Sequence, residues 1–336
     1  MIKCGIIGYG RIGRTRAREI LNNENTELIA IYDKYLISEK PDRVILCESV
    51  DELIDQDIQA VFICAYNKVA APYTIKALGA GKHVFCEKPP ARTSDEVRQV
   101  IEAENKSGMV LKYGFNHRYH YSVMEAAKLI KNNTFGKLLW LRGIYGKAGG
   151  NQFTKSWRND PKLSGGGILI DQGIHMLDLI RFFAGEFEVV DCIVQTSCWD
   201  IPVEDNAFVL MKNNDGVSAM VHSSATQWRH KFSLDMCFEE GYINLEGILT
   251  STRSYGDETL ILARKQFEDS AYAMGKPREE RIFFDTDDSW KFELQEFVEA
   301  IQNKYNIHYG NSSDALQVML LTESIYNKSK FDGNNK

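Results

Sequence analysis

Two side chains able to exchange a proton stand four residues apart in the middle of the chain. Asp171 and His175 follow a run of three glycines and open an apolar helical pattern, so we expect both on one face of a helix. Asp178, three residues further on, falls on the same face. A carboxylate and an imidazole on a rigid element can form a proton-transfer site, because imidazole titrates near neutral pH. A helix that buries a satisfied histidine explains the same residues equally well.

Lys88 is the second candidate for chemistry. It stands after the apolar run His83–Cys86 and before Pro89 and Pro90, and a following proline restricts its backbone. If the run is a strand of a parallel sheet, Lys88 lies near the carboxyl end of that strand, where ligands bind. Its ammonium group can then face a substrate oxygen. An exposed lysine after a strand is the alternative.

A glycine-rich turn near the start predicts a dinucleotide site. Gly8, Gly10 and Gly13 lie between an apolar strand and a helical pattern, and Asp33 ends a second strand twenty residues after the last glycine. In this context the glycines permit the tight turn, the close approach of a pyrophosphate and the packing of the helix on the strand. Asp33 can accept hydrogen bonds from ribose hydroxyls and would repel a 2′-phosphate, which favours NAD over NADP, although Lys34 weakens that repulsion.

Strands and helices alternate through the first part of the chain, which predicts an α/β Rossmann domain with a doubly wound parallel sheet over residues 1–120. The expected strands are Ile2–Gly8, Glu27–Asp33, Ala60–Ala65, His83–Cys86 and Val110–Gly114. The expected helices are Arg11–Asn22, Val50–Ile54, Val69–Ala80, Ser94–Ser107 and Ser122–Asn132, with Ser94 as the cap of its helix.

The later pattern consists of short strands joined by polar turns. It predicts an α+β domain with a large open antiparallel sheet over residues 121–336, and an uncovered face of such a sheet is a common surface for self-association. The expected strands are Lys137–Tyr145, Val189–Ser197, Ala207–Met211, Val217–Thr226, Phe232–Phe238, Tyr242–Leu245 and Thr259–Ala263. The expected helices are Gly167–Ala184, Trp290–Asn303 and Ser312–Lys330.

Composition excludes several classes of protein. The net charge of −6 argues against nucleic acid or an anionic membrane as a partner, and no apolar run approaches the length of a membrane span. The first strand follows the initiating Met so closely that we expect no signal peptide. The seven cysteines contain no C-x-x-C pair, so we expect a cytoplasmic protein with reduced thiols and no metal site.

Four motifs in this order resemble one family, the Gfo/Idh/MocA oxidoreductases, named for glucose–fructose oxidoreductase, inositol dehydrogenase and a rhizopine-catabolism protein. The resemblance covers nearly the whole chain. One departure is visible, because the family often has a histidine where this chain has Ala70. The motifs are Gly8-Tyr9-Gly10-Arg11-Ile12-Gly13, Glu87-Lys88-Pro89, Trp157-Arg158, and Gly165-Gly166-Gly167 through Asp171-Gln172-Gly173-Ile174-His175.

The resemblance implies a substrate domain built on the open sheet, a homodimer or homotetramer, and hydride transfer between NAD or NADP and a hydroxyl or keto carbon of a sugar or cyclitol. Asp33 makes NADP the less favoured cofactor, and the cations of segment 146–158 make a nucleotide-linked sugar a further candidate substrate. It places Lys88, Asp171 and His175 at the positions of the catalytic residues, where they are expected to meet over the nicotinamide. His175 would be the base, Lys88 would stabilise the alkoxide, and Asp171 would hold a neighbouring hydroxyl or orient the other two. The expected cofactor contacts are Gly8, Gly10, Arg11, Ile12, Gly13, Asp33, Lys34, Ala65, Tyr66, Asn67, Glu87, Lys88, Trp157 and Arg158.

The glycine-rich segment 146–158 is a candidate substrate lid. Its cations could meet a phosphate group, or they could simply solvate a surface loop. The candidate substrate contacts are Asn116, Arg118, Lys147, Lys155 and Arg229.

Two other functions fit the same resemblance. Some relatives use bound NAD transiently and hydrolyse a glycosidic bond, and others are NAD-bound sensors or regulators without turnover. The presence of Lys88, Asp171 and His175 favours an active enzyme, because a sensor needs no proton relay.

Overall fold

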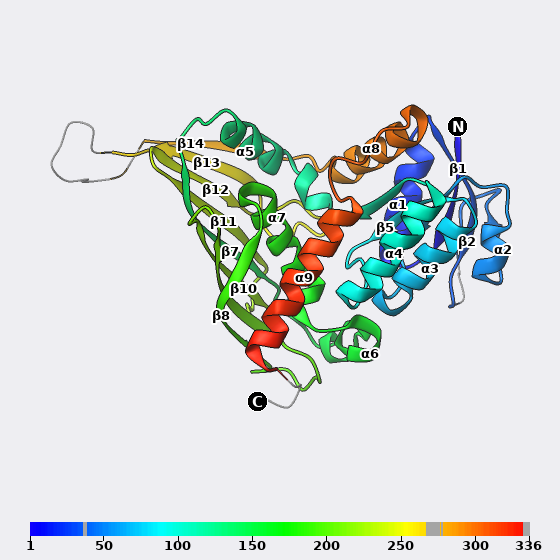
Figure 1. Cartoon of the computed structure of the whole chain (residues 1–336), viewed down its shortest axis with the longest axis horizontal. Coiled ribbons are helices and arrows are strands. Elements are labelled where there is room, and N and C mark those ends of the chain that lie inside the picture. Colours follow the sequence, from blue (N-terminus) through cyan, green and yellow to red (C-terminus); the bar gives the residue numbers. More distant parts are fainter. Residues whose placement is uncertain (36–38, 267–275, 277, 332–336) are drawn as a thin grey trace. The chain divides into compact units, whose positions relative to one another are not determined.

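The structure is a computed structural model that describes residues 1–35, 39–266, 276 and 278–331 (Figure 1). Contacts divide the chain into two compact units, and each is described by itself. Unit 1 comprises Met1–Asn116, Lys162–Gly165 and Trp290–Met319. Unit 2 comprises the described residues of His117–Pro161, Gly166–Ser289 and Leu320–Lys336.

The predicted Rossmann-type sheet is confirmed in unit 1. Six strands lie in the order β3-β2-β1-β4-β5-β6, and every neighbouring pair is parallel. The short edge strand β3 is absent from the sequence prediction, because two residues carry no periodicity. The strands are β1 (Ile2–Ile7), β2 (Thr26–Tyr32), β3 (Ile45–Leu46), β4 (Ala60–Ile63), β5 (His83–Glu87) and β6 (Leu111–Gly114).

Helices α1 (Arg11–Asn22) and α8 (Ser289–Asn303) contribute to one apolar core with the sheet of unit 1. Ile20 of α1 and Phe297 of α8 pack in one buried cluster with Ile6, Phe62 and Phe85 of the strands. The three phenylalanine rings lie with centroids 5.3 to 5.6 Å apart. Burying each such side chain contributes about 1.5–3 kcal/mol. This core therefore brings α8, which comes late in the chain, onto the sheet formed by the first part.

The helices of unit 1 begin close to their predicted positions. Thr93, not Ser94, caps α4, because the Thr93 hydroxyl accepts a hydrogen bond from the Glu96 N–H while Ser94 is already helical. The helices are α1 (Arg11–Asn22), α2 (Val50–Ile54), α3 (Asn67–Gly79), α4 (Ser94–Ser107) and α8 (Ser289–Asn303). The division between units falls within α6 (Pro161–Ser164) and α9 (Ser312–Ser329).

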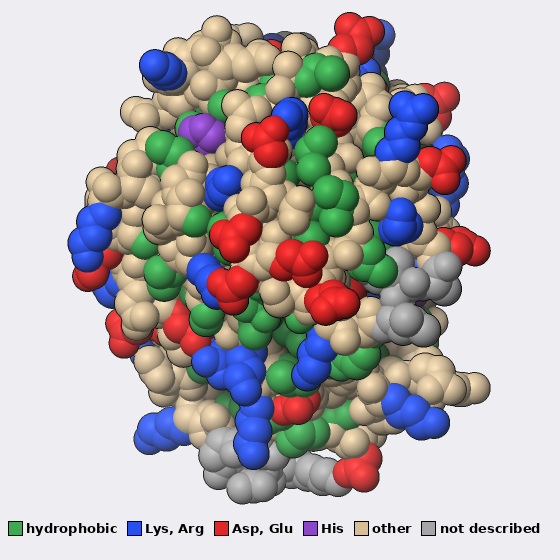
Figure 2. Space-filling view, turned by 90° about the vertical axis from the view of Figure 1, so that its right-hand side faces the viewer, with side chains coloured by type: hydrophobic (Ala, Val, Ile, Leu, Met, Phe, Trp, Pro, Cys, Tyr) green, Lys and Arg blue, Asp and Glu red, His purple; other side chains and the backbone are tan. Residues whose placement is uncertain are grey.

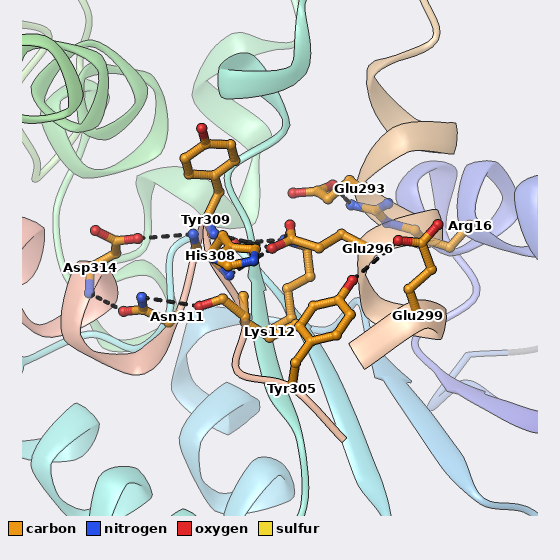
Figure 3. A network of polar contacts seen from close by, with 12 residues as sticks. Arg16, Lys112, Glu293, Glu296, Glu299, Tyr305, His308, Tyr309, Asn311 and Asp314 are labelled. Atoms are coloured by element: carbon orange, nitrogen blue, oxygen red, sulfur yellow. Dashed lines mark hydrogen bonds and ion pairs between the residues drawn. The ribbon is translucent and has the colours of Figure 1, made fainter. Parts of the chain in front are cut away.

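Buried charges join α1, β6 and α8 in unit 1 (Figure 3). Arg16 donates from Nε to Glu87 Oε1 (2.6 Å) at the end of β5, and from Nη2 to Glu293 Oε2 (2.5 Å) on α8. Lys112 Nζ on β6 donates to Glu296 Oε2 (2.7 Å). The carboxyl end of β5 is thereby tied to the helix that follows the glycine turn.

Unit 2 contains an eight-stranded sheet in the order β14-β13-β12-β11-β7-β10-β9-β8. The predicted antiparallel sheet is confirmed, with one parallel pair, β10 with β7, among its neighbouring strands. A parallel pair forms between strands that are not consecutive in the chain. Turn residues indicate only how consecutive strands are connected, so they do not predict this pair. The strands are β7 (Leu138–Gly146), β8 (Phe187–Gln195), β9 (Asn206–Asn213), β10 (Ser218–Ser224), β11 (Lys231–Phe238), β12 (Gly241–Glu246), β13 (Glu258–Arg264) and β14 (Glu279–Phe284).

The two faces of this sheet differ. Helix α7 (Ile174–Ala184) packs on β7 and β10, and α5 (Tyr121–Lys131) packs on β12 and β13 (Figure 1). The strands alternate buried and exposed residues, as expected when one face is covered. Exposed apolar side chains of the opposite face include Trp140, Ile193, Phe208, Leu210 and Met220.

Acidic and basic side chains are interspersed over the face shown in Figure 2. Among the residues that the structure describes, no helix is long and apolar enough to cross a membrane. In the same part of the chain, no three His, Cys, Asp or Glu side chains gather as metal ligands would.

Candidate active site

The glycines of the turn in unit 1 are of two kinds. Close backbone contacts require Gly8 and Gly13, whereas packing does not explain Gly10. Gly8 has φ +91°, and a Cβ there would lie 2.6 Å from the Cys64 carbonyl oxygen. A Cβ on Gly13 would lie 2.0 Å from the Gly8 oxygen, so helix α1 could not approach the strand. A Cβ on Gly10 would meet nothing within 4 Å. The open space at Gly10 fits a turn that leaves room for a pyrophosphate.

Asp33 follows β2 and is held against the glycine turn. Its Oδ2 accepts a hydrogen bond from the Tyr9 N–H (2.5 Å), and its Oδ1 accepts one from the Tyr35 N–H (2.9 Å). The carboxylate is thus fixed beside the loop that would carry the pyrophosphate. Arg11 and Lys34 are both exposed.

The predicted residues at the next strand ends have defined partners within unit 1. Asn67 is buried and donates from Nδ2 to the Ser164 carbonyl oxygen (2.8 Å), while the Tyr66 hydroxyl bonds to that of Tyr35 (3.1 Å). Lys88 is half-buried after β5, and its peptide bond to Pro89 is cis. Asn67 therefore binds the segment that precedes Gly165-Gly166-Gly167.

In unit 2, a π-helical turn, Leu169–Gly173, precedes α7. The sequence predicts an α-helix from Gly167. The structure corrects this prediction, because Leu169–Gly173 is π-helical and the α-helix begins at Ile174. Glu204 supplies the physical reason for the location of this turn. Its carboxylate accepts from the N–H groups of Gly167 (2.8 Å) and Leu169 (3.0 Å), and its carbonyl accepts from Ile168 (3.1 Å). Turns of this kind are frequent at functional sites.

Glu204 also explains why one residue of Gly165-Gly166-Gly167 is a glycine. A Cβ on Gly167 would lie 2.1 Å from the Glu204 carbonyl oxygen, so close backbone contact within the protein requires this glycine. Two backbone N–H groups at the start of this segment, those of Gly167 and Leu169, are therefore bound by the Glu204 carboxylate. Burial raises the pKa of Glu204, and the Tyr326 hydroxyl (2.7 Å) and backbone N–H groups lower it only in part.

Asp171 lies in the π-helical turn between two cations. Lys147 Nζ donates to Asp171 Oδ2 (2.9 Å), and Arg158 Nε donates to Asp171 Oδ1 (3.0 Å). The Arg158 guanidinium also lies over the Trp157 ring at 4.6 Å from its centroid. The structure thus brings together the predicted catalytic residue Asp171, the predicted substrate contact Lys147 and the predicted pair Trp157-Arg158.

His175 is buried against a second histidine. Its ring stacks on that of His117 with centroids 3.8 Å apart and planes 12° apart. Nε2 of His117 lies 3.0 Å from the Tyr145 hydroxyl. Burial, followed by the charges of neighbouring groups, raises the pKa of Tyr145 well above its usual value, so this hydroxyl stays protonated at neutral pH.

Asp178 is paired with a buried arginine of the same unit. It accepts from Nε (2.8 Å) and Nη2 (2.6 Å) of Arg118, and both side chains are buried. This bidentate pair favours a structural role for both, although the sequence makes Arg118 a substrate candidate. Asn116 is buried, whereas Lys155 and Arg229 are exposed.

Tyr255, which no sequence pattern marks, joins Gln172 and His230 near this cluster. Gln172 Nε2 donates to the Tyr255 hydroxyl (2.6 Å), and the His230 ring lies with its centroid 4.8 Å from that of Tyr255. Burial and the nearby charge of Lys147 lower the pKa of His230. Tyr255 lies outside every predicted element, so no periodicity marks it.

The sequence matches two descriptions of one family. Residues 2–115 match an oxidoreductase family with an NAD-binding Rossmann fold, and residues 123–244 match the GFO/IDH/MocA C-terminal domain. The D-glucoside 3-dehydrogenase of Escherichia coli K12 is 29% identical over 266 residues, which is 70% of this chain and 74% of that protein. The inositol 2-dehydrogenase of Salmonella typhimurium LT2 is 25% identical over 289 residues, 80% of this chain and 82% of that protein.

Solved structures share the fold. A levoglucosan dehydrogenase in complex with NADH and L-sorbose superposes with a TM-score of 0.83 at 21% identity, over 100% of this chain and 99% of that chain. The aldose–aldose oxidoreductase from Caulobacter crescentus, complexed with glycerol, gives 0.83 at 23% identity, over 98% of this chain and 97% of that chain.

Proposed function

Because the chain belongs to the Gfo/Idh/MocA family of NAD-binding oxidoreductases, we propose that it oxidises or reduces a CH–OH carbon of a sugar or cyclitol. One observation carries this proposal: His175 is buried beside His117 one helical turn after Asp171, whose carboxylate lies between Lys147 and Arg158. This cluster combines a titratable ring with groups that bind hydroxyls. Relatives named for glucosides and inositol support the substrate class.

Each catalytic residue has a separate task in this proposal. His175 takes the proton from the reacting hydroxyl, and its stacking on His117 keeps the ring in one plane. Asp171 accepts a hydrogen bond from a neighbouring hydroxyl, while Lys147 and Arg158 hold its carboxylate. Lys88 stabilises the alkoxide electrostatically. The nicotinamide supplies the hydride acceptor or donor.

The test is a spectrophotometric screen at 340 nm with NAD and a panel of sugars and cyclitols. His175→Ala is expected to lower turnover by about 10²–10⁴-fold with NAD binding nearly unchanged. His308→Ala, an exposed histidine, is the matched control and should keep wild-type turnover. Wild-type rates in the His175 variant would remove it from this role. Cleavage of a glycoside without NADH accumulation would favour the hydrolase, and a stoichiometric protein partner without turnover would favour the sensor.

We infer a preference for NAD over NADP. The fixed Asp33 carboxylate supports this, because a 2′-phosphate beside it would be repelled. The ratio of kcat/KM for NAD to that for NADP should exceed one, and Asp33→Ala should reduce it. A wild-type enzyme that prefers NADP would contradict the inference.

We infer that the exposed apolar face of the unit 2 sheet mediates self-association into a dimer or tetramer. Leu210 and Met220 are cross-strand partners on this face, and Phe208 lies next to them. An exposed apolar patch of this kind is typical of an interface. Light scattering after gel filtration should show an oligomer, and Leu210→Glu should reduce its mass. A wild-type monomer would refute this inference.

We also propose a cytoplasmic location. All seven cysteines are free thiols in the structure, which supports a reducing compartment. Fractionation with a marker enzyme of the cytoplasm tests this directly.

A further inference from the structure

Three aromatic side chains of unit 2 form a group that extends from Asp171 to the surface. The Phe153 and Trp199 ring centroids lie 5.0 Å apart, and those of Trp199 and Trp228 lie 6.1 Å apart. Lys147 Nζ, which holds Asp171, lies 5.1 Å from the Phe153 centroid. We call Phe153, Trp199 and Trp228 the aromatic wall.

The middle of the wall is held rigidly. Trp199 Nε1 donates to the Ala225 carbonyl oxygen (2.8 Å), and the Trp199 N–H donates to Asp205 Oδ2 (2.9 Å). Asp205 also accepts from the N–H groups of Ser197 and Cys198, both at 2.8 Å. Burial alone would raise the pKa of Asp205, but these hydrogen bonds together lower it, so the carboxylate stays charged and the loop stays fixed.

The wall is also built into the candidate substrate lid. A Cβ on Gly149 would lie 2.2 Å from Trp199, so only glycine allows the lid to cross this ring, and its φ of +73° independently favours glycine. The Gln227 N–H donates to the Lys147 carbonyl oxygen (3.3 Å), which joins the turn that carries Trp228 to the start of the lid.

Trp228 at the outer end has no evident role in folding. It is 66% exposed, although tryptophan strongly favours burial. Its φ is +54°, a conformation that is costly for a bulky residue. An exposed aromatic ring held in this conformation beside a candidate active site points to a ligand.

We propose that the aromatic wall is a subsite for a second pyranose ring, so that the substrate is a glycoside or disaccharide and not a free monosaccharide. This rests on the proposed function, in which the reacting ring occupies the cluster around Asp171. Aromatic rings stack on the apolar C–H faces of pyranoses, and Trp and Tyr rings supply large contact area at low entropic cost.

The geometry favours a sugar over the nucleotide of a nucleotide-linked sugar. The rings of the wall meet at 54° and 66°, which forms a bent surface and not the parallel slot that suits a flat base. Lys147 and Arg158 are both paired with Asp171, so a diphosphate would have to compete with this carboxylate for them.

The experiment is calorimetry with NAD present, using cellobiose, maltose and lactose against glucose and galactose. Wild-type protein should bind at least one disaccharide about tenfold more tightly than its monosaccharides, and Trp228→Ala should remove that difference. Trp228→Phe should retain most of it. Phe283→Ala is the matched control, since Phe283 is 68% exposed and lies on β14.

The following results would reject or retain the second-pyranose subsite. It fails if no disaccharide binds more tightly than its monosaccharides, if Trp228→Ala changes nothing, or if UDP binds in a manner that depends on Trp228. Equal melting temperatures of the variants exclude loss of folding as the cause. Disaccharide binding that requires Trp228, without NADH formation, would retain the subsite and reject the proposed dehydrogenase. NADH formation from monosaccharides alone would retain the dehydrogenase and reject the subsite.

Discussion

Each unit contains a cluster of paired carboxylates and cations, and the two clusters differ in their access to water. In unit 1, Arg16 is 1% exposed between Glu87 (11%) and Glu293 (0%), and its guanidinium lies over the Phe85 ring at 4.1 Å. In unit 2, Asp171 is 15% exposed between Lys147 (18%) and Arg158 (35%). Paired charges thus form a closed cluster that joins elements in unit 1 and a more exposed cluster at the candidate active site in unit 2.

The burial of a charged side chain decides how much the loss of its partner lowers the free energy of unfolding. A buried ion that loses its partner keeps its desolvation penalty, whereas a partly exposed ion can recover hydration. Substitutions in the unit 1 cluster should therefore act on stability, and those in the unit 2 cluster should act on activity.

The largest effect is expected from Arg16→Met. This variant leaves Glu87 and Glu293 buried without their cation, so the free energy of unfolding should fall by about 3–5 kcal/mol in urea denaturation. The double variant Arg16→Met/Glu293→Leu should recover part of the loss, because one buried carboxylate is gone. Wild-type stability of Arg16→Met would show that the cluster is not closed.

Asp171→Asn should produce the opposite pattern. We expect kcat to fall by about 10²–10³-fold, because the variant no longer holds a substrate hydroxyl with a charged acceptor. The free energy of unfolding should change by less than about 1 kcal/mol, since the site is open to water. Asp215→Asn on an exposed turn is the control for both measurements. A large loss of stability with normal turnover would reverse the comparison.

Glu293→Gln tests the closed cluster through pH. Burial raises the pKa of Glu293 to about 7, although the charges of Arg16 and Lys112 act to lower it. A carboxyl group with a raised folded pKa stabilises the protein fully below its unfolded value of about 4.5, and that contribution is lost as pH rises through about 7. The variant should lack this change, which we expect to be about 1–3 kcal/mol between pH 5 and 8. Parallel pH profiles of the two proteins would contradict the assignment.

The smallest effect is expected from Arg142→Ala. Arg142 Nη2 lies 2.6 Å from Asp235 Oδ2 on two neighbouring strands of unit 2, and Arg142 is exposed. Such a pair contributes about 0.2–1 kcal/mol, and 0.5 M salt should reduce the difference between wild type and variant. A loss comparable to that of Arg16→Met would show that exposure does not separate these clusters.

The sequence by itself determined the local elements and the dinucleotide loop. Apolar periodicity and glycine spacing are properties of adjacent residues, so β1, α1 and the fixed position of Asp33 could be anticipated. The motifs also determined the family, because they retain their order along the chain.

Only the tertiary structure decided which partner each polar group takes. Asp178 pairs with Arg118 across 60 residues of sequence, and Glu204 holds Gly167 across 37. The parallel pairing of β7 with β10 and the contribution of Trp228 to the aromatic wall belong to the same class. No local signal reports these contacts, because they arise where packing brings distant segments together and desolvation favours a hydrogen-bond partner for a buried polar group.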